Sequence, residues 1–123
     1  LVASLIGTPY LPDLRKAILI LEEVDEAPHR VDRMFAQLQN TGILKKASGL
    51  LLGKFTDCVP GDVSKPHLTV GQVLEDISRR VKCPVLSNVQ YGHIPKKLTI
   101  PLGLMAKMDT RKGLIEINEA GVS

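Results

Sequence analysis

The chain has 123 residues, of which 44% are hydrophobic and 24% are charged, and these values suit one globular domain with a single core. They exclude a disordered tail and a fibre. The formal net charge of +3 and the 3% content of aromatic residues argue against a surface that binds nucleic acid.

The first half of the chain predicts a strand–helix–strand unit. The apolar run 16–23 has the length of a strand that is covered on both faces. A helix with one apolar face follows, beginning near Pro28 and ending before Gly42. Its apolar positions recur at helical spacing: Val31, Met34, Phe35 and Leu38. A second buried strand at 47–55 completes a parallel pair with a right-handed crossover.

The second half adds a helix, a third strand and a set of short strands. A turn-rich loop leads to a capping-box pattern at Thr69, which predicts a second helix with one apolar face. The third parallel strand is expected at 84–89. Three short segments separated by turn signals (97–103, 104–109 and 113–118) predict an antiparallel β-meander. The predicted fold class is therefore α/β: a small, mostly parallel sheet with crossover helices and a C-terminal antiparallel meander.

The apolar runs and the two cysteines indicate in which compartment the protein works. No apolar run approaches the ~20 residues of a membrane span, and no segment has the features of a signal peptide. Cys58 and Cys83 lie far apart without a CxxC spacing, so we expect neither a disulfide framework nor a zinc site. We therefore expect a cytoplasmic protein without a membrane partner.

Two residues that could carry chemistry follow the carboxyl ends of predicted strands. Glu22 lies at the end of the first strand and His93 lies beyond the third, so both belong to the same edge of a parallel sheet. A carboxylate that accepts the Nδ1–H of an imidazole leaves Nε2 free as a base. The alternatives are that His93 only caps a loop and that Glu22 belongs to a solvated acidic helix entrance.

The third member of such a catalytic set is missing. The sequence has no GxSxG elbow, and none of its serines lies on a glycine-framed turn. Cys58, on a loop, is a weak candidate for the nucleophile. A metal site would need a third ligand beside Glu22 and His93, and no HExxH or similar spacing supplies one, so we expect no metal and no cofactor.

The runs ILILEEVDEAPHRVDRMFAQLQNTGIL, YGHIPKKLTIPLG and SLIGTPYLPDL occur in this chain. They resemble motifs of the LD-carboxypeptidase family, which includes the muramoyltetrapeptide carboxypeptidases and the microcin immunity peptidases. The run ILILEEVDEAPHRVDRMFAQLQNTGIL is similar to the family's strand ending in Leu-Glu-Asp or Leu-Glu-Glu, followed by an Asp-Arg-Met helix. The run YGHIPKKLTIPLG is similar to its Gly-His and Leu-Thr-Leu-Pro-Leu-Gly element, and SLIGTPYLPDL is similar to the join between its two domains. The resemblance covers essentially the whole chain.

The resemblance implies a cytoplasmic serine peptidase with a Ser–His–Glu triad, which releases the terminal D-alanine of murein tetrapeptide during cell-wall recycling. Carried over to this sequence, the glutamate is Glu22 rather than Glu23, and the histidine is His93. Residues 1–12 then correspond to an inter-domain linker and helix end, and residues 13–123 to a C-terminal domain of the swivelling type. The nucleophilic serine belongs to an N-terminal domain that is not in this chain, so the chain alone is expected to be inactive.

The resemblance leaves specificity open. His29 stands where Tyr is common, and Ile94 and Lys97 stand where a Gly and an Asn-like residue follow the histidine. One alternative is a microcin-immunity-type peptidase, which has the same triad and acts on an acyl-nucleotide peptide. Another is a non-catalytic α/β binding module. By family analogy, the full-length protein is expected to be a homodimer without a nucleic-acid partner.

Overall fold

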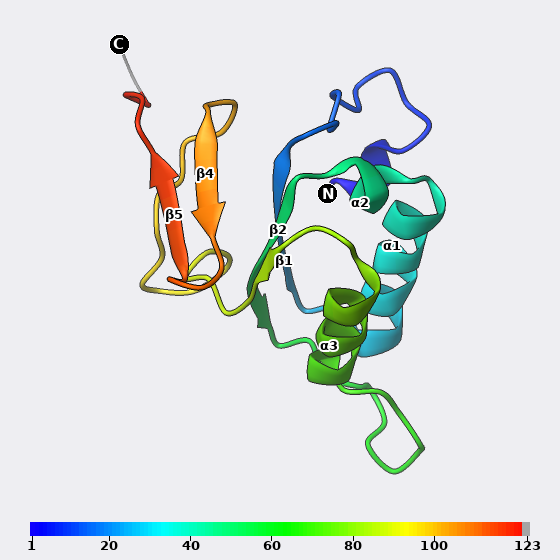
Figure 1. Cartoon of the computed structure of the whole chain (residues 1–123). Helices are drawn as coiled ribbons and strands as arrows, with labels where there is room; N and C mark the ends of the chain where they lie inside the picture. Colours follow the sequence, from blue (N-terminus) through cyan, green and yellow to red (C-terminus); the bar gives the residue numbers. More distant parts are fainter. Residues whose placement is uncertain (122–123) are drawn as a thin grey trace.

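A three-stranded parallel sheet forms the centre of the structure (Figure 1), a computed structural model that describes residues 1–121. Its strands are β1 (Ile18–Val24), β2 (Gly49–Thr56) and β3 (Val85–Leu86), in the spatial order β1-β2-β3. The β2 strand lies in the middle and pairs with both neighbours, and its first five residues are all buried. This burial on both faces explains the continuous apolar sequence of β2.

Helices link the strands and cover one face of the sheet. The chain passes from β1 to β2 through α1 (Pro28–Asn40) and the short α2 (Ile43–Lys46), and from β2 to β3 through α3 (Val70–Arg80). Both crossovers step in the same direction across the sheet, so a common hand places α1 and α3 on the same side, as Figure 1 shows. No helix within residues 1–121 is long and apolar enough to span a membrane.

The ends of the helices follow the signals in the sequence. Pro28 occupies the first turn of α1, and Gly42, with a φ of 76°, ends the turn that follows it. The predicted capping box is confirmed: Thr69 Oγ1 accepts the backbone N–H of Gln72 at 3.2 Å, and the backbone N–H of Thr69 donates to Gln72 Oε1 at 2.8 Å. Local sequence therefore sets where both crossover helices begin.

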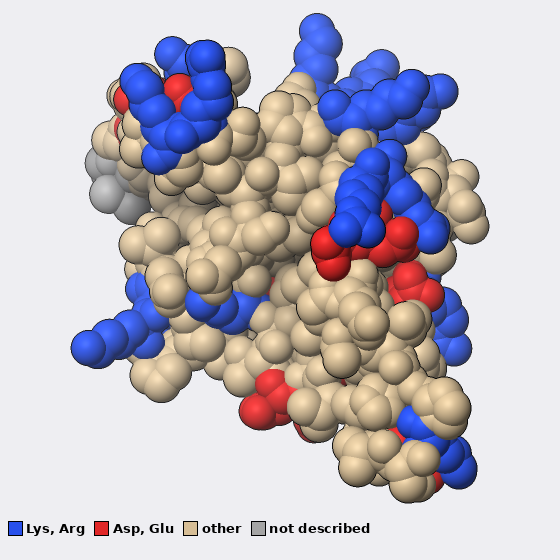
Figure 2. Space-filling view, turned by 60° about the horizontal axis from the view of Figure 1, so that its bottom comes forward, with Lys and Arg blue, Asp and Glu red and all other residues tan. Residues whose placement is uncertain are grey.

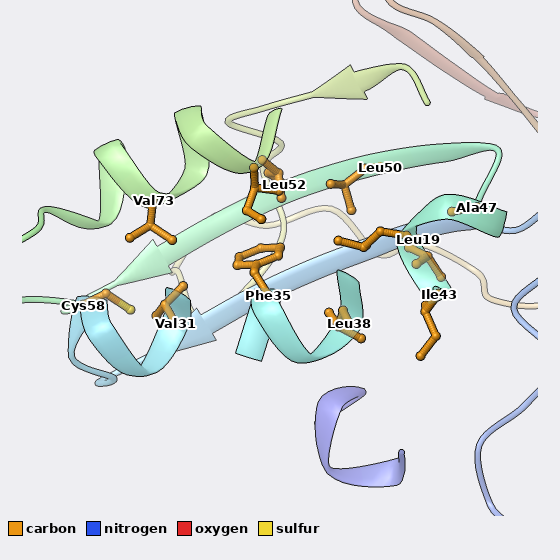
Figure 3. Close-up of a cluster of buried hydrophobic side chains, with 12 residues drawn as sticks. Leu19, Val31, Phe35, Leu38, Ile43, Ala47, Leu50, Leu52, Cys58 and Val73 are labelled. Carbon is orange, nitrogen blue, oxygen red and sulfur yellow. The ribbon is translucent and has the colours of Figure 1, made fainter. Parts of the chain in front are cut away.

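The hydrophobic core lies between the sheet and these helices. Leu50 and Leu52 of β2 are 0% exposed, and both point toward the helices (Figure 3). Phe35 of α1 packs beneath them, with Val73 of α3 alongside. The predicted apolar stripe of α1 is thus its core-facing side, and burial of this surface is the main stabilising contribution to the fold.

A hairpin-like pair of strands forms a further layer. Strands β4 (Ala106–Asp109) and β5 (Leu114–Ile117) are antiparallel and lie on the side of the sheet away from the helices (Figure 1). A Cβ atom on Gly49 would lie 2.8 Å from Met108 Cε, so the missing side chain of this glycine leaves room for β4 to approach β2. The layers are therefore helices, parallel sheet and antiparallel pair.

The α/β class, the parallel sheet and the antiparallel C-terminal pair agree with the sequence prediction, whereas the third parallel strand is shorter than predicted. It was expected at 84–89 but contains only Val85 and Leu86. Asn88 has a φ of 62°, in the left-handed region, which interrupts extended pairing. The chain beyond it is free to turn toward β2.

The predicted three-stranded meander is a two-stranded sheet. Residues 97–103 form no strand. Leu98 donates its backbone N–H to Gln90 O at 2.7 Å, and Pro101 has no N–H for a ladder. Near the N-terminus, the expected end of a helix is a single 3₁₀ turn at Ala3–Leu5. These differences leave the arrangement of the layers unchanged.

Charged side chains are spread over the surface in separate groups. Figure 2 shows groups of Lys and Arg on one face, some with acidic side chains directly beside them. On α3 the ion pairs Arg79–Glu75, at 2.5 Å, and Arg80–Asp76, at 2.7 Å, follow the i, i+4 spacing. Such exposed pairs contribute little to stability, so the core, not the surface charge, holds the domain together.

The contribution of the core to stability can be tested at Leu52, which lies at its centre. The substitution Leu52→Ala removes a side chain that is 0% exposed and leaves a cavity between β2 and the helices, so we expect it to lower the free energy of unfolding by ~2–5 kcal/mol in urea denaturation. Leu102→Ala is the control, because Leu102 is 72% exposed and its loss should change stability by less than ~0.5 kcal/mol. Equal effects of the two substitutions would contradict the described core.

Candidate functional site

The side chains of Glu22 and His93 meet at the carboxyl edge of the sheet. His93 Nδ1 lies 2.9 Å from Glu22 Oε2, although the two residues are 71 positions apart in the chain. An ionised carboxylate can only accept, so Nδ1 carries the hydrogen and donates it to Glu22. The neutral imidazole then presents an unprotonated Nε2, for which no hydrogen bond exists among residues 1–121.

Exposure differs between the two partners. The side chain of Glu22 is 25% exposed, whereas that of His93 is 63% exposed. The carboxylate is therefore held within the fold, and the imidazole stands at its surface. An imidazole whose Nδ1 is held by a carboxylate and whose Nε2 faces solvent can accept a proton from a group outside the domain.

Strand alternation explains why Glu22, and not Glu23, reaches the histidine. Leu19 and Leu21 pack against the core cluster under the helices, so Glu22 lies on the opposite face of β1. By the same alternation Glu23 lies on the helix side of β1, with Leu19 and Leu21, and its Oε1 accepts the N–H of Val24 at 3.0 Å. The face opposite the helices is the one on which the segment after β3 runs.

A bulge in β2 lies directly beside Glu22. Leu21 pairs with Leu52 and Glu23 pairs with Phe55, so two residues of β2, Gly53 and Lys54, stand opposite the single residue Glu22. A bulge of this kind bends the strand and redirects the side chains next to it. Here it occurs opposite Glu22, the residue of β1 whose carboxylate contacts His93.

Two glycines let the backbone come close enough for the contact. A Cβ atom on Gly53 would lie 2.6 Å from Tyr91 O and 3.2 Å from Glu22 Cβ. A Cβ atom on Gly92 would lie 3.0 Å from Glu22 Oε2, and the φ of Gly92, 126°, is one that other residues rarely adopt. The chain therefore passes directly over β2 just before it presents His93.

Hydrogen bonds fasten this passing segment to β2. The backbone N–H of Val89 donates to Leu52 O at 3.1 Å, and the N–H of Lys54 donates to Tyr91 O at 2.8 Å. Lys54 Nζ also donates to the side-chain oxygen of Asn88, the residue in the left-handed conformation. These bonds fix the backbone on both sides of the bulge, so the position of His93 is set by the sheet.

A groove opens beside the pair. Its volume is about 330 Å³. It is lined by residues of the site and of the segment that follows His93: Glu22, Tyr91, Gly92, His93, Lys97, Leu98, Thr99 and Ile100. A small ligand group in this groove would contact the imidazole on one side and a lysine with apolar neighbours on the other.

The described chain brings no nucleophile to His93. No Ser or Cys lines the groove, and Thr99, which does, forms no hydrogen bond with His93 among residues 1–121. Cys58, the weak candidate from the sequence, is 4% exposed, and burial raises the pKa of its thiol. A thiol that resists ionisation is a poor nucleophile, so Cys58 is a core residue.

The remaining histidines stand apart from the site. His29 is exposed in the first turn of α1, and His67 is exposed in the loop before α3, where its Nδ1 contacts Lys65 O at 2.8 Å. Within residues 1–121, no group of three or more His, Cys, Asp or Glu side chains is arranged to hold a metal ion.

Sequence reasoning placed Glu22 and His93 at a common edge but missed the residues that join them. Gly53, Lys54 and Asn88 were not singled out. A glycine inside an apolar strand is a known sign of a bulge or of close backbone approach, so Gly53 carried a usable signal. The bond between Lys54 and Asn88 carried none, because it depends on the path of the chain after β3.

Comparisons with known proteins agree with this architecture. Residues 1–108 match the family described as LD-carboxypeptidase C-terminal domain. The chain is 39% identical over 123 residues to the probable murein peptide carboxypeptidase of Bacillus subtilis, and it covers 38% of that protein. It is 28% identical over 120 residues to the microcin C7 self-immunity protein MccF of Escherichia coli, of which it covers 33%.

Solved structures show the same fold. The crystal structure of muramoyltetrapeptide carboxypeptidase from Oxalobacter formigenes superposes with a TM-score of 0.76 at 33% identity, over 97% of this chain and 39% of the other. The structure of MccF in complex with aspartyl sulfamoyl adenosine superposes with a TM-score of 0.79 at 28% identity, over 97% of this chain and 35% of the other. The chain thus spans between about a third and two fifths of the length of these relatives, and it belongs to the LD-carboxypeptidase C-terminal domain family.

Proposed function

We propose that this chain is the C-terminal domain of a serine LD-carboxypeptidase and that it supplies Glu22 and His93 to a Ser–His–Glu triad. The observation that carries the proposal is the 2.9 Å contact between His93 Nδ1 and Glu22 Oε2, which leaves Nε2 at an exposed surface. A binding module has no need for this arrangement, whereas acyl transfer by a weak nucleophile requires it. Family membership supports the same class of chemistry.

The proposed reaction has two stages. His93 Nε2 takes the hydroxyl proton of a serine as its oxygen attacks the scissile carbonyl, and Glu22 stabilises the imidazolium that forms. His93 then gives this proton to the amine of the leaving residue as the peptide C–N bond breaks, which leaves an acyl-enzyme. Water, deprotonated by His93, hydrolyses the ester and restores the serine.

In this proposal the serine and the oxyanion hole come from a separate N-terminal domain. The chain covers only 38% of its Bacillus subtilis relative, which leaves ample length for such a domain. Residues 1–12 serve as the connection and residues 13–123 as the catalytic partner domain. The open face of His93 is the side on which the serine would arrive.

The proposed substrate is murein tetrapeptide, from which the enzyme releases the terminal D-alanine. The proposed enzyme is a homodimer that acts in the cytoplasm during cell-wall recycling. The names of relatives at 39% and 33% identity support a murein peptide. The alternative is an acyl-nucleotide peptide of the microcin type, and its support is the similarity to MccF, at 28% identity and a TM-score of 0.79. Turnover of both substrates by the same protein, compared as kcat/KM, decides between them.

The direct test is D-alanine release by the full-length protein that contains this chain. Wild-type protein should release D-alanine from murein tetrapeptide, and His93→Gln should lower kcat by about 10³-fold or more, because the substitution removes the proposed general base. His67→Gln is the control, since His67 lies outside the site. A His93→Gln protein with near-wild-type kcat would refute the triad assignment.

The isolated domain provides a second test. The purified 123-residue chain should show no turnover of murein tetrapeptide above background, because it contributes the base and its orienting acid without a nucleophile or an oxyanion hole. Steady release of D-alanine by this chain, abolished by His93→Gln, would mean that the nucleophile lies within it.

The contribution of the negative charge of Glu22 can be tested with a neutral side chain of the same size. Glu22→Gln keeps the size of the side chain but holds the imidazole without stabilising its charged form, so we expect kcat to fall by about 10²–10⁴-fold while KM changes little. Glu23→Gln, on the other face of β1, should retain near-wild-type kcat. A larger loss in Glu23→Gln than in Glu22→Gln would reverse the assignment of the acid.

The close approach at the bulge predicts that a methyl group added at Gly53 lowers activity. Gly53→Ala would place a Cβ atom 2.6 Å from Tyr91 O, which forces the segment that carries His93 away from Glu22, so kcat should fall at least about tenfold. Gly49→Ala is a matched control in the same strand, because its Cβ meets only the flexible end of Met108 and the side chain of Ile18. Similar kcat values for the two variants would contradict the positioning role of Gly53.

A further inference from the structure

We propose that Lys97 binds the free α-carboxylate of the residue that the enzyme releases, and thereby restricts the reaction to peptides with an unblocked C-terminus. This inference rests on the proposed function, because it assigns a role within the same groove. It names a class of substrate, C-terminal peptide acids, and a residue that selects them.

Lys97 is the one Lys or Arg among the residues that line the groove beside His93. It has no ion pair with an acidic side chain among residues 1–121, whereas Lys65, Arg15 and Arg30 each pair with a carboxylate. The residue is exposed, so its side chain can be reached by a ligand that enters the groove. The neighbouring Lys96 is also exposed but does not line the groove.

The chemistry of the leaving group places a carboxylate close to His93. The imidazole gives its proton to the leaving amine, so Nε2 and that nitrogen must come within about 3 Å. In a terminal amino acid the carboxylate carbon is joined to the Cα that carries this nitrogen, so its oxygens lie only about 3 Å further on. The carboxylate must therefore occupy the space beside His93, where the groove lies.

Lys97 has apolar neighbours in the groove. Leu98 and Ile100 line the same groove, so a carboxylate bound there would form a charge-assisted hydrogen bond with the ammonium beside apolar side chains. Glu22, the acid in the groove, accepts the hydrogen of His93 Nδ1, and no ion pair joins it to Lys97 among residues 1–121. Lys97 is thus a cation of the groove that no acidic side chain of the described residues neutralises.

A terminal carboxylate is also what separates an exopeptidase from an endopeptidase. A peptide that continues more than one residue beyond the scissile bond, or ends in an amide, places a neutral group against Lys97 and leaves the ammonium without its partner. The cost of an unmatched charged group in a site of this kind gives discrimination of about 10- to 100-fold. Selection by Lys97 therefore predicts a preference for acids over amides.

The test compares two ligands and two lysines in the full-length protein. The ligands are murein tetrapeptide with a free C-terminal carboxylate and the same tetrapeptide as its C-terminal amide. We expect wild-type kcat/KM to favour the acid by about 10- to 100-fold, Lys97→Met to lose this preference by slowing the acid alone, and Lys96→Met to behave as wild type. Lys97→Arg, which keeps the charge, should retain most of the preference.

Binding measurements make the inference independent of turnover. In a His93→Gln background, calorimetry should show tighter binding of the acid than of the amide, and addition of Lys97→Met should remove the difference. An equal loss for acid and amide in Lys97→Met, an unchanged preference, or binding of neither ligand would overturn the role of Lys97. Preferential binding of the acid through Lys97 without D-alanine release by the wild-type protein would overturn the proposed function and leave the role of Lys97 standing.

Discussion

The close approach of the chain at Tyr91 to the backbone of Gly53 is the constraint on which the site depends. Parallel strands alone bring residues to a common edge but do not bring their side chains into contact. The bulge in β2 and the absent side chain of Gly53 allow the segment after β3 to lie directly on the strand, within reach of Glu22. The contact between His93 and Glu22 is therefore a consequence of backbone packing, reinforced by hydrogen bonds on either side of the bulge.

This arrangement separates stability from chemistry within one strand. Leu50 and Leu52 of β2 face the helices and fix the sheet through burial, while Gly53, one position further, faces the site and has no side chain. The Glu22–His93 pair lies on the face away from the main core, where the cost of desolvating the carboxylate is limited by its partial exposure. A rigid scaffold with the functional groups on its open face keeps their geometry without placing an unmatched charge in the interior.

The sequence predicted what depends on local pattern and missed what depends on the path of the chain. The apolar runs of β1 and β2, the stripe of α1 and the capping box of Thr69 are local signals, and each element formed as predicted. The shortening of β3 was missed because the left-handed Asn88 is stabilised by Lys54, a residue 34 positions earlier. The common edge followed from topology, but the 2.9 Å contact needed the glycine approach, which only tertiary structure defines.

The uneven exposure of the pair fits the proposed mechanism, in which the site is shared with a second domain. A base that must receive a proton from a group on another body has to stand at the surface of its own domain, and a mobile imidazole there would lose its orientation. Holding Glu22 at 25% exposure behind a histidine at 63% exposure resolves this conflict, because the less exposed acid fixes the ring that the surface presents. In the proposed mechanism the second domain then needs to bring only a hydroxyl and an oxyanion hole, since the direction of proton transfer is already set by β1 and the bulge in β2.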